Sequence, residues 1–173
     1  MPAVERYQLA ARVDRWVIKK ALAWMADHQE GVELCSINLS GQSVGDAAFL
    51  SQVLQAMDQT PVRGDRLCFE ITETAAMGDL AAANRFFQAL RARGCQFALD
   101  DFGSGLSSYA YLRELAVDTL KIDGQFVKNM ADDPVSFAMV KSIHEIGCLM
   151  GKKTVAEFAE SQAIVDLLTG LGV

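Results

Sequence analysis

The sequence predicts an α/β fold in which parallel strands alternate with helices, and three observations carry that prediction. Short apolar runs and longer amphipathic segments alternate five times along the 173 residues. Polar or charged residues follow these apolar runs where a strand should end. No linker, low-complexity tract or close repeat interrupts the alternation. One domain of about five βα units is therefore expected over residues 1–173, and both a barrel and an open, doubly wound sheet allow it.

The first elements are a helix, a strand and a second helix. Apolar residues recur at three- and four-residue steps from residue 5 to about 28, which predicts an amphipathic helix. A strand is expected over residues 33–39 and a helix over about 46–57. Pro61 and Gly64 then predict a loop that ends this helix.

The middle of the chain continues the alternation. A strand is expected over residues 67–72, and a helix over 79–93 that Gly94 ends. The apolar run at residues 96–100 predicts the next strand, and residues 109–115 have a helical pattern.

The last elements are two strands, each followed by a helix. Strands are expected over residues 118–122 and 153–156. Asp133 and Pro134 predict the start of a long helix that reaches Met150. Ser161 can cap a final helix, which the glycines at 170 and 172 end.

Composition and charge exclude several classes of function. The chain is 51% hydrophobic and 22% charged, as in an ordinary soluble globular domain, and its net charge of −6 disfavours binding to nucleic acid or anionic membrane. No apolar run approaches the roughly 20 residues that span a bilayer, and no secretory leader is apparent, so a cytoplasmic location is expected. The four cysteines lack C-x-x-C spacing and are expected to pack as small, reduced apolar groups.

The residues that follow the predicted strands indicate a site for cations. Five side chains at these positions offer only oxygen ligands, which suit Mg²⁺ or Mn²⁺: Asn38, Glu70, Asp100, Asp101 and Glu157. Two such ions can activate a water and neutralise the attacking and leaving oxygens of a phosphodiester. Lys121 can then orient the water or steady charge on the phosphate.

Other polar residues are expected to support this site. Lys121 and Asp123 are two apart in a strand, so they share a face, and Asp123 can hold the lysine in position. Glu73 is three positions from Glu70, so we expect it in the loop after the strand, where it ties down its neighbour. The glycines at 103 and 105 favour a loop that moves when ligand arrives.

Each of these residues also has a purely structural explanation. Asp100 or Asp101 can cap the following helix, and Thr72 or Thr74 can do so after the preceding strand. Lys121 and Asp123 can be a plain ion pair, while Asn38 and Ser40 can serve only their turn. The conjunction of these residues at successive strand ends favours the functional interpretation.

Five motifs together resemble the EAL-domain family, in the order of that family and over nearly the whole chain. They are Ile37-Asn38-Leu39-Ser40, Phe69-Glu70-Ile71-Thr72-Glu73, Leu99-Asp100-Asp101-Phe102-Gly103-Ser104-Gly105-Leu106-Ser107-Ser108, Leu120-Lys121-Ile122-Asp123 and Val155-Ala156-Glu157. The resemblance implies a modified TIM (β/α)₈ barrel that hydrolyses cyclic di-GMP to pGpG with two Mg²⁺ or Mn²⁺ ions and is inhibited by Ca²⁺.

The resemblance also implies roles for individual residues. Asn38, Glu70, Asp100, Asp101 and Glu157 would bind the metals, with Lys121, Asp101 and Glu157 acting in catalysis. Glu73 would anchor the loop after Asp101, with Asp123 and Glu160 in support. The substrate loop would comprise Phe102, Gly103, Ser104 and Gly105.

Several departures from the family pattern keep other functions open. Phe158 stands where the family usually has glycine, and its ring can crowd the site. No Glu-Ala-Leu tripeptide occurs in these residues, so we expect an EAL domain truncated at both ends. The alternatives are a non-catalytic module that binds cyclic di-GMP and an unrelated metal-dependent phosphohydrolase.

The resemblance implies a wider setting for the chain as well. A homodimer is expected, together with fusion to sensory or GGDEF-type domains. The chain can then be the cytoplasmic part of a larger, membrane-bound signalling protein.

Overall fold

The computed structural model describes residues 9–28, 30–104 and 109–173. Five strands form its sheet in chain order: β1 (Cys35–Leu39), β2 (Leu67–Thr72), β3 (Gln96–Phe102), β4 (Thr119–Ile122) and β5 (Lys153–Ala156). The pairs β1–β2, β3–β4 and β4–β5 are parallel, which confirms the predicted α/β class. The chain divides into two compact units with a boundary within β3, and residues 72–74 also belong to the second unit.

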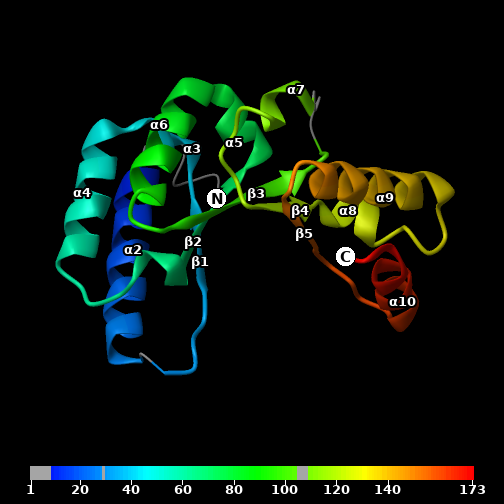
Figure 1. Ribbon diagram of the computed structural model, residues 1–173, viewed down its shortest axis with the longest axis horizontal. Coiled ribbons are helices and arrows are strands. Elements are labelled where there is room, and N and C mark those ends of the chain that lie inside the picture. The colour runs from blue at the N-terminus through cyan, green and yellow to red at the C-terminus, as the bar shows by residue number, and fades with distance from the viewer. Residues whose placement is uncertain (1–8, 29, 105–108) are drawn as a thin grey trace. The chain divides into compact units, whose positions relative to one another are not determined.

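The first unit packs its helices beside the parallel pair β1 and β2. These helices are α2 (Ala10–Asp27), α3 (Gly41–Gly45), α4 (Ala47–Asp58) and α6 (Leu80–Arg91) (Figure 1). Helix α2 contacts both β1 and α4. Phenylalanine rings fill the core: Phe49 stacks on Phe86, and the Phe87 and Phe97 ring centroids lie 4.4 Å apart. A single turn of 3₁₀ helix (Gly64–Arg66) leads into β2.

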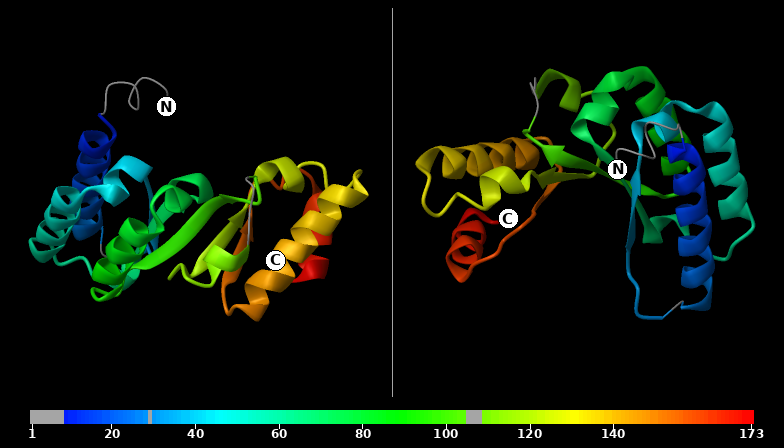
Figure 2. Two further views of the ribbon diagram at one scale, coloured as in Figure 1. Left: turned by 90° about the horizontal axis from the view of Figure 1, so that it is seen from above. Right: turned by 180° about the vertical axis from the view of Figure 1, so that it is seen from behind.

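In the second unit, a long helix crosses the strands β4 and β5. This helix is α9 (Pro134–Leu149), and the others in the unit are α7 (Tyr109–Leu112), α8 (Gly124–Val127) and α10 (Gln162–Leu171) (Figure 2). Gly147 brings α9 close to the sheet, because a Cβ at this glycine would lie 2.9 Å from Cγ2 of Thr154. The side chains of Leu120 and Ile122 are fully buried in β4.

The predicted caps of the later helices are confirmed. Asp133 accepts hydrogen bonds from the backbone N–H groups of Val135 and Ser136, with Pro134 opening α9. Ser161 accepts a hydrogen bond from the N–H of Ile164 and caps α10. Local cap chemistry therefore sets these helix starts as the sequence predicts.

Most predicted elements are present, with differences at their ends. Strands β2 and β5 have the predicted bounds, while β3 runs two residues past the predicted end at Asp100. Three short helices were not predicted: α3, α5 (Glu73–Gly78) and α8. The prediction that Glu73 lies in a loop is wrong, because it is the first residue of α5. The predicted helix start at residue 5 lies outside the described residues.

The cysteine prediction holds for the cysteines near the strands and fails for the one on α9. Cys68 and Cys95 are buried, and Cys35 is half-buried. Burial raises the pKa of the Cys95 thiol to about 12, so this thiol stays protonated at neutral pH. Cys148 is exposed on the solvent side of α9 and does not pack as a core residue.

Candidate functional site

A cluster of three carboxylates lies in the second unit, at the ends of β3 and β5. Asp100, Asp101 and Glu157 each place one carboxylate oxygen within 4.8 Å of the others. Asp100 and Asp101 lie in the last residues of β3, and Glu157 directly follows β5. The structure thus brings together three of the five residues predicted to bind metal.

An irregularity in β3 explains how two adjacent aspartates reach one cluster. The register advances by three residues in β3, from Leu99 to Phe102, while β4 advances by two, from Leu120 to Ile122. Asp101 takes a φ of +52°, in the left-handed region. Neighbouring residues of a regular strand point to opposite faces, and a bulge with one extra residue re-aims a side chain. The bulge therefore allows both carboxylates to contribute.

Lys121 bridges two of the carboxylates. Its Nζ lies 2.9 Å from Oδ1 of Asp100 and 2.8 Å from Oε1 of Glu157. The lysine side chain is only 14% exposed, so solvent screens these ion pairs less than pairs on the surface. One ammonium cannot balance three ionised carboxylates, and the cluster keeps an excess of negative charge.

Burial and the crowding of negative charge both act on the pKa of Asp101. Its pKa is raised, first because burial disfavours the charged form, and then because the carboxylates of Asp100, Asp123 and Glu157 repel it. Lys121 opposes this shift. Additional positive charge at the cluster would therefore favour the ionised form of Asp101.

The donor chemistry of the cluster fits a hard divalent cation. Oδ1 of Asp100 is buried, lies 2.9 Å from the Lys121 ammonium, and receives no neutral hydrogen-bond donor among the described residues. A buried carboxylate oxygen of this kind is a ready ligand, and the cluster offers oxygen atoms only. The residues present thus suit Mg²⁺ or Mn²⁺ better than zinc or copper.

Glu73 connects the start of α5 to the loop that follows β3. Its side chain is 1% exposed, and Oε2 accepts a hydrogen bond from the Gly103 N–H at 3.0 Å. Oε1 accepts a hydrogen bond from the hydroxyl of Tyr111. These are the contacts that the predicted anchoring role requires. Tyr111 was not identified from the sequence, since an aromatic residue in a short helical segment carries no signal of such a partner.

The other two predicted metal ligands lie in the first unit. Asn38 on β1 and Glu70 on β2 are register partners in neighbouring parallel strands. Glu70 is buried, and Asn38 is exposed. The structure therefore places these two residues side by side on neighbouring strands, and their convergence with the three carboxylates stays a prediction.

Comparisons with known proteins decide the family. The model of the EAL domain matches residues 1–173. The chain belongs to the EAL domain family. It is 44% identical over 173 residues to the cyclic di-GMP phosphodiesterase PdeB of Shewanella oneidensis, in a match that covers 99% of this chain and 20% of that protein. It is 34% identical over 175 residues to the cyclic di-GMP phosphodiesterase PdeF of Escherichia coli, in a match that covers 100% of this chain and 23% of that protein.

Solved structures support the same assignment. The PaMucR phosphodiesterase in complex with c-di-GMP superposes with a TM-score of 0.91 at 32% identity, covering 99% of this chain and 70% of that one. The FimX EAL domain of Pseudomonas aeruginosa bound to c-di-GMP gives a TM-score of 0.91 at 28% identity, covering 99% and 69%. This EAL domain thus has the predicted TIM-barrel-like α/β fold. The chain spans about a fifth to a quarter of the length of the curated relatives named above.

Two residues predicted to support the site have other contacts in this EAL domain. Asp123 caps α8, because its Oδ1 accepts a hydrogen bond from the N–H of Gln125 at 2.7 Å. This cap accounts for Asp123, and its predicted role in holding Lys121 stays a prediction. Glu160 is exposed, with Oε1 3.7 Å from Nζ of Lys128.

The predicted substrate loop is only partly accessible. Phe102 is 1% exposed at the end of β3, so its ring belongs to the core, and its assignment to the loop is wrong. Ser104 donates a hydrogen bond to the backbone oxygen of Asp101 at 2.9 Å and closes a turn. Gly105 lies outside the described residues.

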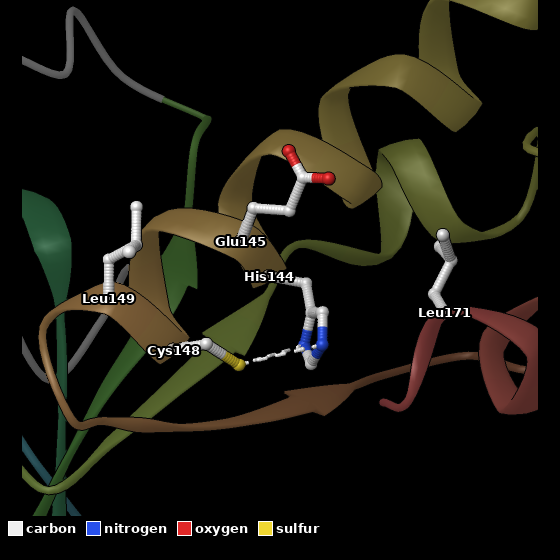
Figure 3. A pocket seen from close by; sticks show the side chains of 5 residues that line it. All are labelled: His144, Glu145, Cys148, Leu149 and Leu171. Carbon is white, nitrogen blue, oxygen red and sulfur yellow. Dashed lines mark hydrogen bonds between the residues drawn. The ribbon is translucent and has the colours of Figure 1, made fainter.

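A separate surface pocket of the EAL domain lies between α9 and α10. Four of its lining residues come from α9 and one from α10: His144, Glu145, Cys148, Leu149 and Leu171 (Figure 3). The ring of His144 contacts the thiol of Cys148 and lies 2.6 Å from Oγ1 of Thr154 through Nδ1. None of the predicted site residues lines this pocket. Among the described residues, no helix is long and apolar enough to cross a bilayer.

Proposed function

We propose that this EAL domain hydrolyses cyclic di-GMP to linear pGpG with two Mg²⁺ or Mn²⁺ ions. The observation that carries the proposal is the oxygen cluster of Asp100, Asp101 and Glu157 with Lys121 between two of its members. Relatives that match nearly the whole chain are named cyclic di-GMP phosphodiesterases, and the PaMucR structure contains c-di-GMP. Cluster chemistry and relatives support the same substrate class.

In this proposal, some residues of the chain bind the cations and another positions the water. Divalent ions, when bound, lower the pKa of water and neutralise charge on the reacting phosphate. Asp100, Asp101 and Glu157 supply ligands from the second unit, and Asn38 and Glu70 are the predicted ligands from the first.

Lys121 supplies positive charge from the protein itself. Its ammonium carries three donors, and two carboxylates already fix its position. The ammonium can orient the attacking water or steady charge on a phosphate oxygen. Because two carboxylates hold Nζ, its position is established before substrate arrives.

Chromatography after incubation with cyclic di-GMP tests the activity. We expect pGpG in the presence of Mg²⁺ or Mn²⁺, and we expect Asp100→Asn to abolish product formation. Asp166→Asn is the matched control, because Asp166 is an exposed acid on α10 whose Oδ1 accepts a hydrogen bond from Gln162. Full turnover in Asp100→Asn would rule out the assigned role of that carboxylate.

The second candidate is a module that binds cyclic di-GMP without cleaving it. It is favoured by Phe158, which directly follows Glu157 and stands where the family resemblance implies glycine. A binding titration in Ca²⁺, where cleavage is expected to be inhibited, separates the two functions. Binding in Ca²⁺ without pGpG in Mg²⁺ or Mn²⁺ supports the binding module.

The proposal extends to the setting of the chain. We propose a cytoplasmic homodimer fused to sensory or GGDEF-type domains. Fusion is supported by MucR of Pseudomonas aeruginosa, named a bifunctional diguanylate cyclase and cyclic di-GMP phosphodiesterase, which is 32% identical over 175 residues. Light scattering of the purified protein tests the dimer, and a monomeric mass contradicts it.

A further inference from the structure

Phe158 directly follows Glu157 and has a strained backbone. Its φ is +57°, in the left-handed region, where the Cβ of an L-residue crowds the carbonyl oxygen. Such a conformation persists only where surrounding contacts hold it. The side chain is 56% exposed, so burial of the ring in a core does not explain the conformation.

One edge of the ring lies on the first residue of α8. A Cβ built at Gly124 would stand 2.1 Å from Cδ2 of Phe158, far inside van der Waals contact. The ring therefore occupies the space that any side chain at position 124 would need. Because Gly124 directly follows the Asp123 cap, the ring is seated at the start of α8.

The end of α8 holds the ring as well. Lys128, which follows the last residue of α8, places Nζ 4.2 Å from the centroid of the Phe158 ring. The same Nζ lies 3.7 Å from Oε1 of Glu160, two residues after Phe158. Both ends of α8 thus contact the turn that connects β5 to α10.

From these contacts we infer that Phe158 is a positioning residue that keeps Glu157 in the carboxylate cluster. Glu157 and Phe158 are adjacent in the chain, so a ring fixed on α8 restricts the directions that the Glu157 side chain can take. Glu157 indeed reaches Lys121, with Oε1 2.8 Å from Nζ. Rotation of the turn that released the ring would carry the carboxylate out of this contact. The inference rests on the cation site of the proposed function and does not require hydrolysis of cyclic di-GMP.

A double-mutant cycle measured by Mn²⁺ binding tests the inference. Phe158→Ala removes the ring, and Gly124→Ala displaces it, so each is expected to weaken Mn²⁺ binding about tenfold, the scale for residues that orient metal ligands. The double variant is expected to bind no more weakly than Phe158→Ala alone, because the methyl group added at position 124 then meets no ring. Isothermal titration calorimetry on the whole chain gives these affinities.

Matched variants separate this role from general destabilisation. Gly170→Ala is the glycine control, since a Cβ there meets nothing within 4 Å, and Phe158→Tyr keeps the ring, so both are expected to bind Mn²⁺ as the parent does. Phe158→Gly removes the ring and also relieves the left-handed strain. Its unfolding temperature is expected to stay or rise while Mn²⁺ affinity falls, whereas a merely structural residue would lower both together.

The outcomes distinguish the inference from the proposed function. Unchanged Mn²⁺ affinity in Phe158→Ala and Gly124→Ala overturns the positioning role, even if these variants hydrolyse cyclic di-GMP. Failure of the parent chain to bind Mn²⁺ overturns it too. Mn²⁺ binding that follows the cycle, without any pGpG, overturns the proposed hydrolysis and leaves the positioning role standing.

Discussion

Each unit contains a polar cluster with aspartates, and the two clusters differ in how many hydrogen bonds their aspartates accept. In the first unit, Oδ2 of Asp14 accepts hydrogen bonds from the N–H of Ser40 and from the hydroxyls of Ser40 and Ser43, at 2.9, 2.7 and 2.6 Å. In the second unit, the buried Oδ1 of Asp100 meets the Lys121 ammonium at 2.9 Å and receives no neutral hydrogen-bond donor among the described residues, and the backbone of the neighbouring Asp101 is strained.

The difference supports the proposal that Asp14 serves the fold and that Asp100 and Asp101 serve a bound cation. Hydrogen bonds to Asp14 tie α2 to the turn that starts α3, so this carboxylate stabilises the first unit. The carboxylates of Asp100, Asp101 and Glu157 repel one another, and Lys121 compensates only in part. A protein keeps such unfavourable charge where a cation relieves it.

The largest expected effect comes from Asp100→Asn. Removing one of the crowded charges leaves the protein as stable as before or more so, because repulsion at the cluster falls. Turnover of cyclic di-GMP should drop by about 10³-fold or more, the scale of losing a preorganised electrostatic group. Parallel measurement of pGpG formation and of unfolding by urea checks both halves. A large loss of stability would show that Asp100 serves the fold, as Asp14 does.

The next largest effect is expected at Glu73, a carboxylate beside the cluster that accepts hydrogen bonds on both of its oxygens. Glu73→Ala frees the Gly103 N–H and the Tyr111 hydroxyl, so the loop after β3 shifts. A misplacement of about 1 Å can cost on the order of 10²-fold in rate, and we expect a loss of this size in kcat.

Tyr111→Phe is the graded partner of that change. It removes the hydroxyl that donates to Glu73 and keeps the Gly103 N–H donor, so the loss in kcat should be smaller than in Glu73→Ala. Stability should fall by about 1 kcal/mol, since the buried Glu73 carboxylate loses one hydrogen bond. Equal kinetics for the two variants would contradict graded anchoring through Glu73.

Asp14→Ala tests the cluster of Asp14, Ser40 and Ser43 in the first unit. Removing the carboxylate leaves the buried Ser43 hydroxyl and the Ser40 N–H without their charged acceptor. We therefore expect the free energy of unfolding to fall by about 2–3 kcal/mol. Affinity for Mn²⁺ should not change. Asp14→Asn, which keeps an acceptor oxygen, should lose less. Calorimetry on the folded variants distinguishes this pattern from a role in cation binding.

The fold and the carboxylates of the second unit could be predicted because their signals are local. Polar residues flank strands β2 and β5 on both sides, and Asp133 and Ser161 are ordinary helix caps. Acidic residues at the ends of parallel strands are brought to one edge of a sheet, which is how Asp100, Asp101 and Glu157 were identified.

Features that depend on distant contacts could not be predicted. The bulge at Asp100 and Asp101 has no local signature, because it is defined by the partner strand β4. The link between Glu73 and Tyr111 joins residues 38 positions apart. Helices such as α5 are too short for a periodic pattern, so Glu73 was expected in a loop.

The smallest expected effect is on the stability of the protein at acidic pH and comes from Asp133, a hydrogen-bonded aspartate outside both clusters. Asp133 accepts hydrogen bonds from the hydroxyl and N–H of Ser136 and from the N–H of Val135, and these lower its pKa below the ordinary value of 3.8. In the pH range between the two pKa values of Asp133, the folded state binds fewer protons than the unfolded state. The stabilisation from the ionised Asp133 carboxylate is complete above its pKa in the unfolded chain. This stabilisation disappears as the pH falls through the lower pKa of Asp133 in the folded protein.

Asp133→Asn should therefore flatten the acidic part of the curve of unfolding free energy against pH. Ser136→Ala removes the hydroxyl and keeps the backbone donors, so it should flatten the curve less. Urea titrations at a series of pH values below neutrality measure the slope. An unchanged slope in Asp133→Asn would mean that these hydrogen bonds persist in the unfolded chain. In that event, hydrogen bonds counted in the folded state would not be enough to distinguish an aspartate that stabilises the fold, such as Asp14, from one that binds a cation, such as Asp100. The comparison would then depend on the cation titrations alone.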